Sequence, residues 1–142
     1  MKYYIRNGRR FVRVKSLKGM FYNSDGTFTE KRTDKSIGIC VHDDFEETII
    51  ASLTVSRKSE EYNVAKSACK AAFPFGEGHI PSRKELFMAM EYKQHINTAG
   101  YSLWTSESRW GFVWILSLLD GYISSSHRCN YYCVLPFLTI KK

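Results

Sequence analysis

The stretch that decides the fold is residues 101–121, YSLWTSESRWGFVWILSLLDG. Within it, residues 101–106 and 113–119 have the apolar and aromatic content of extended segments, and Asp120-Gly121 is a turn pair. Residues 131–140 predict one more strand. Two helices and further strands are expected upstream, so helices and strands are segregated along the chain. This order predicts an α+β fold rather than a parallel sheet.

Two helices are predicted before these strands, over residues 59–73 and 82–94. The first is expected to start at Ser59, with Glu60 and Glu61 in its first turn, where the helix dipole favours anions. Its predicted apolar stripe, which makes Cys69 a small core residue, is Val64, Ala65, Ala68, Cys69 and Ala72. The second helix is expected to start at the capping box Ser82-Arg83-Lys84-Glu85.

Strands are also predicted before the helices, over residues 37–41 and 48–53, which are rich in β-branched side chains. A turn at residues 23–26, Asn-Ser-Asp-Gly, precedes them. The acidic stretch 43–47 joins the two strands. It lacks the spacing of a known calcium loop, so we interpret it as a solvated turn.

Residues 2–15 predict a β-hairpin, because Asn7-Gly8 is a favoured type I′ turn pair. A two-residue loop there would place three pairs opposite each other: Lys2 with Arg13, Tyr4 with Phe11 and Arg6 with Arg9. Like charges across a ladder are destabilising, so this basic face is expected to dock an anionic partner. That partner would be an acidic patch on a neighbouring subunit, another virion protein or nucleic acid. The alternative is a solvated face whose repulsion is screened by salt.

The positive charge of the chain is concentrated at its start. The net charge is +7, and residues 1–20 hold seven basic side chains and no acidic one. The other 122 residues hold 14 of each sign. This distribution argues against a uniformly basic nucleic-acid-binding domain. We therefore divide the chain into a basic hairpin, residues 1–16, and a domain of residues 17–142.

No apolar run approaches the roughly 20 residues of a membrane span. The N-terminal sequence MKYYIRNGRR lacks the apolar stretch of a secretory signal peptide, so export by the usual route is not expected. Four cysteines form no CxxC motif and four histidines are scattered, so no metal and no cofactor is expected. We interpret the cysteines as free thiols in a reducing compartment.

Five segments occur in an informative order: SDGTF with IGI at 24–39, small residues at 65–69, IPSRKEL at 80–86, LWTSE at 103–107, and Trp114 with DG and YCVLP at 120–136. In this order they resemble a bacterial and phage family of C-type-lectin-like fold. That family is related to the formylglycine-generating-enzyme scaffold and to the variable proteins of diversity-generating retroelements.

The resemblance covers about residues 20–140 and implies a C-type-lectin-like fold, with two helices flanking a small, mostly antiparallel sheet. It also implies that the first and last strands pair and bring the termini together. The N-terminal β-hairpin lies outside it. Leu135 stands where the family usually has Arg, which puts local detail in question.

Catalysis is not expected. The oxidase relatives use a cysteine pair, and Cys129 and Cys133 are the nearby candidates, but residues four apart on a strand are roughly 13 Å apart. Asp120 and Glu107 are single carboxylates without an evident partner. The Glu-Pro-Asn and Trp-Asn-Asp signatures of calcium-dependent lectins are absent.

The remaining function is recognition of a partner by a surface of fixed shape. The final strands and their loops are expected to form that surface. Alternation along residues 113–119, aligned with the resembling family, predicts Trp114, Leu116 and Leu118 inward and the residues between them outward. Residues 122–130 are expected to form a loop that adds small polar side chains. The candidate partner-binding residues, with Trp110 and Tyr122 as anchors, are Ser106, Ser108, Arg109, Trp110, Ile115, Ser117, Leu119, Tyr122, Ser125, His127, Arg128 and Asn130.

The leading hypothesis is a non-catalytic ligand- or receptor-recognition domain of a phage virion or a bacterial surface. Its partner would be a protein or glycan on a cell surface, or a neighbouring virion protein, and a homo-oligomer is compatible with the sequence. The missing signal peptide favours a virion assembled in the host cytoplasm, or otherwise a cytoplasmic protein. The alternative is a structural virion or scaffold protein that uses the same face for permanent contacts, as outward aliphatic residues would suit.

Overall fold

The computed structural model describes residues 2–7, 10–56, 59–98, 100 and 102–142. It has two helices, a five-strand antiparallel sheet and a three-strand antiparallel sheet, neither of them closed, besides a two-strand hairpin. The α+β prediction is therefore confirmed.

The five-strand sheet has the order β10-β6-β5-β3-β4. Its strands are β3 (Phe21–Asn23), β4 (Phe28–Thr29), β5 (Ser36–Asp43), β6 (Glu47–Ser52) and β10 (Phe137–Lys141). The strands predicted over residues 37–41 and 48–53 are thus confirmed as β5 and β6. The three-strand sheet has the order β7-β8-β9, with β7 (Ser102–Arg109), β8 (Phe112–Ser117) and β9 (Ile123–His127).

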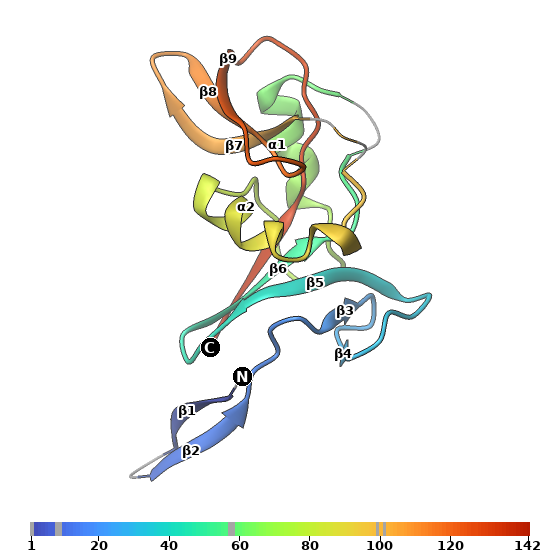
Figure 1. The fold of residues 1–142 in the computed structure, drawn as a ribbon, viewed down its shortest axis with the longest axis vertical. Helices are drawn as coiled ribbons and strands as arrows, with labels where there is room; N and C mark the ends of the chain where they lie inside the picture. Colours follow the sequence, from blue (N-terminus) through green and yellow to red (C-terminus); the bar gives the residue numbers. More distant parts are fainter. Residues whose placement is uncertain (1, 8–9, 57–58, 99, 101) are drawn as a thin grey trace.

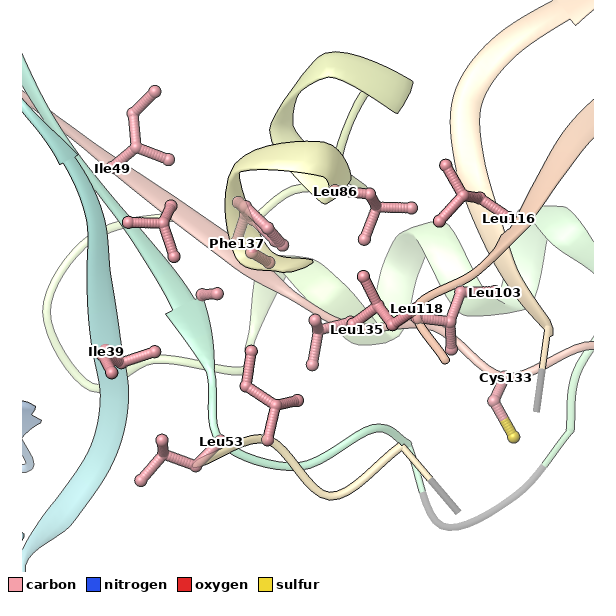
Figure 2. Close-up of a cluster of buried hydrophobic side chains, with 14 of the residues drawn as sticks. Ile39, Ile49, Leu53, Leu86, Leu103, Leu116, Leu118, Cys133, Leu135 and Phe137 are labelled. Carbon is pink, nitrogen blue, oxygen red and sulfur yellow. The ribbon is translucent and has the colours of Figure 1, made fainter. Parts of the chain in front are cut away.

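Helix α2 (Arg83–Met90) lies between the two sheets, and helix α1 (Tyr62–Lys70) runs beside the three-strand sheet (Figure 1). The main core forms around α2. Figure 2 shows Leu86 of this helix between Leu116 of β8 and Phe137 of β10. All three side chains are fully buried in one cluster. Since each sheet leaves one face to be covered, α2 supplies apolar surface to both.

Helix α2 starts where its sequence predicts. The Ser82 hydroxyl accepts a hydrogen bond from Glu85 N–H at 3.1 Å, and the Glu85 carboxylate accepts one from Ser82 N–H at 3.0 Å. This reciprocal pair satisfies two donors that the helix itself leaves free. The helix ends at Met90 rather than near 94, and a separate turn of 3₁₀ helix, η1, spans Lys93–His95.

Helix α1 is shorter than predicted. It runs from Tyr62 to Lys70, its N-cap residue is Glu61, and no side chain caps it. Glu60 cannot join the helix because its backbone N–H and C=O are both paired with Tyr132. The buried stripe is Tyr62, Ala65 and Cys69, so Cys69 is a core residue as predicted. Val64 is 48% exposed, and Ala68 and Ala72 also lie outside the stripe.

Two other predictions for the second half of the chain are wrong. The segment 131–140 is a strand only from Phe137 onward. Before it, Tyr132 and Cys133 form isolated bridges, and Pro136 has no N–H to donate to a ladder. The segment 122–130, predicted as a loop, contains β9.

The N-terminal hairpin consists of β1 (Lys2–Asn7) and β2 (Arg10–Lys15), and it projects from the rest of the molecule (Figure 1). Its register is shifted by two residues from the prediction: Lys2 pairs with Lys15, Tyr4 with Arg13 and Arg6 with Phe11. The expected pairs Lys2–Arg13 and Tyr4–Phe11 are therefore wrong. The expected partner of Arg6, Arg9, lies outside the described residues.

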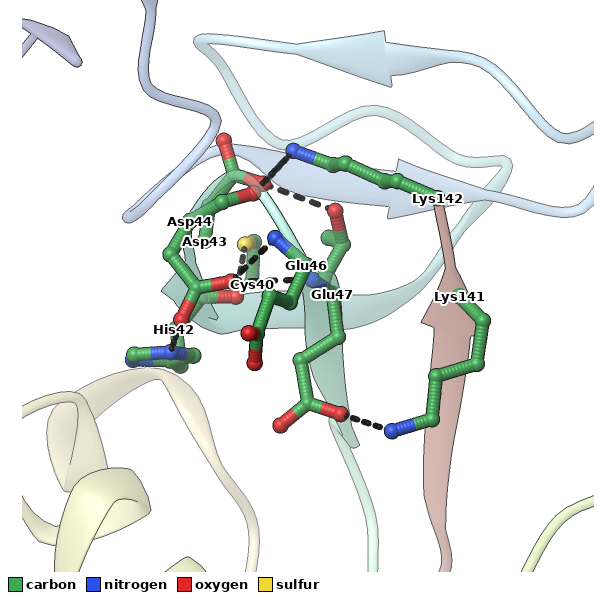
Figure 3. A network of polar contacts seen from close by, with 9 residues as sticks. Cys40, His42, Asp43, Asp44, Glu46, Glu47, Lys141 and Lys142 are labelled. Carbon is green, nitrogen blue, oxygen red and sulfur yellow. Dashed lines mark hydrogen bonds and ion pairs between the residues drawn. The ribbon is translucent and has the colours of Figure 1, made fainter. Parts of the chain in front are cut away.

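A buried carboxylate brings the two ends of the segment 17–142 together. Asp43 Oδ2 accepts from Leu17 N–H at 2.7 Å, and Asp43 Oδ1 accepts from Thr48 Oγ1 at 2.7 Å. Asp43 Oδ1 also accepts from Lys142 Nζ at 2.6 Å (Figure 3). The ends thus converge as predicted, but the pairing of first and last strands is wrong, because β10 pairs with β6 and β1 only with β2. The acidic stretch is not a wholly solvated turn, since the Asp43 side chain is completely buried.

The charge of Asp43 contributes stability at neutral pH. Burial by itself would raise its pKa, but the hydrogen bonds from Leu17, Lys142 and Thr48 outweigh burial and hold the pKa below its ordinary value. A lowered folded-state pKa means that the contribution is complete above the unfolded-state pKa, about 3.9. It is lost as the pH falls through the lower folded-state pKa.

We predict that Asp43→Asn lowers the free energy of unfolding at pH 7 by about 2–4 kcal/mol, because it leaves the Lys142 ammonium without its buried counter-charge. The difference in free energy of unfolding between the variant and the unmodified chain should shrink as the pH falls below about 4. Urea unfolding between pH 2.5 and 7 measures both effects. The control Asp34→Asn removes an exposed carboxylate and should change stability by less than about 0.5 kcal/mol. An equal loss at pH 2.5 and pH 7 would contradict the assignment.

Candidate binding site

An exposed tryptophan sits in a strained turn between β7 and β8. Arg109 pairs with Phe112, so Trp110 and Gly111 form the two-residue connection. Both have positive φ, 53° and 81°, which is the pattern of a type I′ turn. A left-handed backbone costs a residue with a Cβ about 1–2 kcal/mol, and Trp110 is the one non-glycine residue of the described chain that adopts it. Its side chain is 84% exposed.

Further aromatic and cationic groups surround this turn on one face of the three-strand sheet. The Arg109 guanidinium lies 4.2 Å from the centre of the Trp110 ring. Phe112 and His127 pair across β8 and β9, with ring centroids 5.8 Å apart. Together with Trp114 and Ser125, the residues Arg109, Trp110 and Phe112 line a pocket of about 170 Å³. We call these residues and His127 the aromatic face.

Arg83 and Glu107 connect the aromatic face to helix α2. The Arg83 guanidinium lies 4.9 Å from the Trp114 ring. The Glu107 carboxylate holds it there, through Arg83 Nη2 at 3.0 Å and Nε at 3.2 Å, and it also accepts from Arg83 N–H at 2.7 Å. These bonds hold the pKa of Glu107 below its ordinary value, chiefly through the Arg83 side chain. A bidentate pair is more rigid than a single contact, so Arg83 is fixed over Trp114.

The predicted outward orientation of Ile115 is wrong. Ile115 is only 7% exposed and packs with Trp104, Val113 and Val134 in the cluster next to α1. Trp114, predicted inward, is half-exposed beside Arg83. Trp114 and Leu116 share one face of β8, which helix α2 buries at Leu116 but leaves partly open at Trp114, whereas the opposite face is buried at Ile115. Leu116 and Leu118 are fully buried, as predicted.

The other predicted site residues fall into separate groups. Arg109, Trp110, Ser125 and His127 belong to the aromatic face. Leu119 and Tyr122, 64% and 67% exposed, flank the turn at the other end of β8. The six residues of that strand separate its ends by roughly 17 Å. A ligand that contacts both Trp110 and Tyr122 must therefore extend over at least roughly 17 Å.

The remaining predicted residues do not join the aromatic face. Ser108 pairs with Val113, on the alternate side of the sheet, and Ser117 is half-buried near the β8–β9 turn. Arg128 lies 5.6 Å from the Tyr62 ring, and Asn130 donates to the buried Ser126 hydroxyl. Ser106 lines a different pocket, next to α1.

Sequence reasoning missed three residues of this region: Arg83, Phe112 and Trp114. One local signal could have found the last two. Gly111 next to Trp110 predicts a two-residue turn, which places Phe112 and Trp114 on the side of Arg109. Arg83 could not be found in this way, because it reaches the sheet from a helix 31 residues earlier in the chain.

No protein-family model matches the chain, and a comparison with curated proteins finds no match either. In the part of the chain that the structure describes, no helix is long and apolar enough to cross a bilayer. The same residues contain no group of three or more His, Cys, Asp and Glu side chains arranged to hold a metal ion. The function must therefore be inferred from the aromatic face itself.

All four cysteines are unpaired. Cys40 and Cys69 are completely buried, and burial is the main reason why the pKa of each thiol is raised to about 12. Cys133 is also buried, whereas Cys129 is exposed. Because a thiolate is the reactive form, Cys40 and Cys69 are poor nucleophiles at neutral pH.

We predict different stability effects for two positions of this hairpin, one in β8 and one in the turn. Ile115→Ala should lower the free energy of unfolding by about 2–4 kcal/mol, since it opens a cavity next to Trp104. Trp110→Asn should leave it unchanged or raise it by up to about 1 kcal/mol, because Asn-Gly is the favoured type I′ pair. Chemical denaturation of both variants measures this. A large loss in Trp110→Asn would mean that the indole is part of the core.

Proposed function

We propose that this chain is a non-catalytic ligand- or receptor-recognition domain of C-type-lectin-like fold, serving on a phage virion or a bacterial surface. The observation that carries the proposal is Trp110, an exposed indole held on a strained backbone. Strain of this kind persists where function benefits from it, since Asn or Gly would fit the turn at lower cost.

The composition of the aromatic face supports a binding role. Tryptophan and arginine dominate binding hot spots, and here Arg109 stacks on Trp110 while Arg83 stacks on Trp114. The bidentate contact with Glu107 holds Arg83 before any partner arrives. A preorganised surface loses less side-chain entropy on binding, which favours affinity.

Three features of the fold support the C-type-lectin-like part of the proposal. Helices α1 and α2 lie beside antiparallel sheets, and Asp43 holds Leu17 and Lys142 close together. The long segment between β6 and β10 carries both helices and the three-strand sheet. The binding partner suited to the aromatic face is a protein or glycan on a cell surface.

The alternative is a structural virion protein with permanent contacts, and the structure removes one argument for it. It relied on outward aliphatic residues in β8, and Ile115 is buried. Leu119 remains exposed, but a single exposed leucine is normal for a soluble protein.

We predict that Trp110→Asn weakens binding to the cell-surface ligand by more than about 1 kcal/mol while the domain stays folded. Binding to host or bacterial cells and to a glycan array would be measured for the full chain and its variants. Phe45→Ala is the matched control, because Phe45 is an exposed aromatic residue in the β5–β6 connection of the other sheet. Tyr122→Ala tests whether the contact extends to the far end of β8. Equal binding by Trp110→Asn and the unmodified chain would refute the proposal.

The hairpin of residues 1–16 is proposed to dock a neighbouring protein. It forms a sheet of its own, and Lys15 at its end pairs with Glu30 at 2.7 Å. We predict that deleting residues 1–16 leaves a folded domain that no longer assembles with its neighbour, and that assembly of the full chain weakens as salt rises. Size-exclusion chromatography at 50 and 500 mM salt measures both. If neither the deletion nor the salt concentration changed assembly, the hairpin would not be a docking element.

A further inference from the structure

A second pocket, of about 370 Å³, lies between helix α1, the segment that precedes α2, and strand β7. Its walls include Tyr62, Lys66, Lys70, His79, Ile80 and Ser106. It shares no lining residue with the pocket of the aromatic face. Its volume is in the range of pockets that hold small molecules.

The floor of this pocket is rigid. Tyr62 and Ile80 belong to the buried cluster around Trp104, and the Tyr62 ring meets the Trp104 ring edge-on at 5.6 Å. Gly78 crosses the end of α1 so closely that a Cβ there would lie 2.1 Å from the carbonyl oxygen of Cys69. The opposite wall is fixed as well, because Ser106 N–H donates to Pro81 C=O at 2.8 Å.

The polar groups of this pocket are arranged around that apolar floor. Tyr62, Lys66 and Lys70 recur every four residues on α1, so they share one side of the helix. His79 Nε2 lies 3.1 Å from the Glu85 carboxylate, which fixes the imidazole. The Ser106 hydroxyl has no hydrogen-bond partner among the described residues.

The charges favour a monoanion. Glu77 also lines the pocket and lies 3.8 Å from Lys70, so it partly offsets the charge of Lys70. Lys66 has no carboxylate partner within the described chain and is the cation left for a ligand. One uncompensated ammonium suits a carboxylate better than a phosphate dianion.

We propose that this pocket binds a monosaccharide-sized carboxylate. Lys66 pairs with the carboxylate, Ser106 bonds a hydroxyl or amide group of the ligand, and the ring of the ligand lies over the small exposed edges of Tyr62 and Ile80. The site is separate from the aromatic face, so evidence for or against it does not bear on the proposed function.

Titration calorimetry and amide NMR with the full chain test this proposal. The probes are glucuronate, glucose 6-phosphate and neutral glucose. We expect saturable binding of glucuronate, with shifts at Gly78 and Ser106 and none at the Trp110 indole. Glucose should bind at least about tenfold more weakly, because it cannot form the charge-assisted hydrogen bond.

Lys66→Ala should weaken glucuronate binding about tenfold. The matched control Lys84→Ala, which removes an exposed lysine of α2, should leave it unchanged. Four results would overturn the proposal: no saturable binding of glucuronate, equal binding of glucose, tighter binding of glucose 6-phosphate, or shifts confined to the aromatic face.

Discussion

The structure depends on how the N-terminus of helix α2 is held. Its free N–H groups are satisfied from two directions: Ser82 and Glu85 cap it locally, and Glu107 of β7 accepts from Arg83 N–H. A carboxylate at this end is also favoured by the helix dipole. These bonds fix the direction of the helix, which then presents Leu86 to both sheets at once. Without that placement, Leu116 of β8 and Phe137 of β10 would lose the side chain that lies between them.

The same contacts link the core to the surface. Glu107 binds the Arg83 backbone and also its guanidinium, which lies over Trp114. The residue that helps to fix α2 therefore also positions a side chain beside the aromatic face. Fold and candidate site are joined through one ion pair, so a change at Glu107 would affect both.

Local signals in the sequence predicted the elements whose cause is local. The Ser82–Glu85 capping box and the β-branched run of β5 depend on near neighbours, and both were found. The start of α1 was misplaced because Glu60 pairs with Tyr132, which lies 72 residues away. Strand β9 was missed because Ser124, Ser125 and Ser126 have low strand propensity, and pairing with β8 alone makes them extended.

The candidate site was predicted in part for the same reason. Trp110 and Arg109 were identified from residue type, and the turn next to them depends on two adjacent residues. Both faces of β8 carry buried side chains, Ile115 in the cluster beside α1 and Leu116 in the cluster around α2. Alternation along one strand assigns only one face to the core, so it does not predict the burial of Ile115.

The convergence of Leu17 and Lys142 on Asp43 has a consequence for how the domain can be carried. Both residues lie at the Asp43 end of β5, while the β7–β8 turn projects on the far side of the helices (Figure 1). A carrier protein fused at either end would leave the Trp110 turn unobstructed. The same proximity means that a short linker could join residue 142 to residue 17, so the chain is suited to circular permutation or to insertion into a loop of another protein.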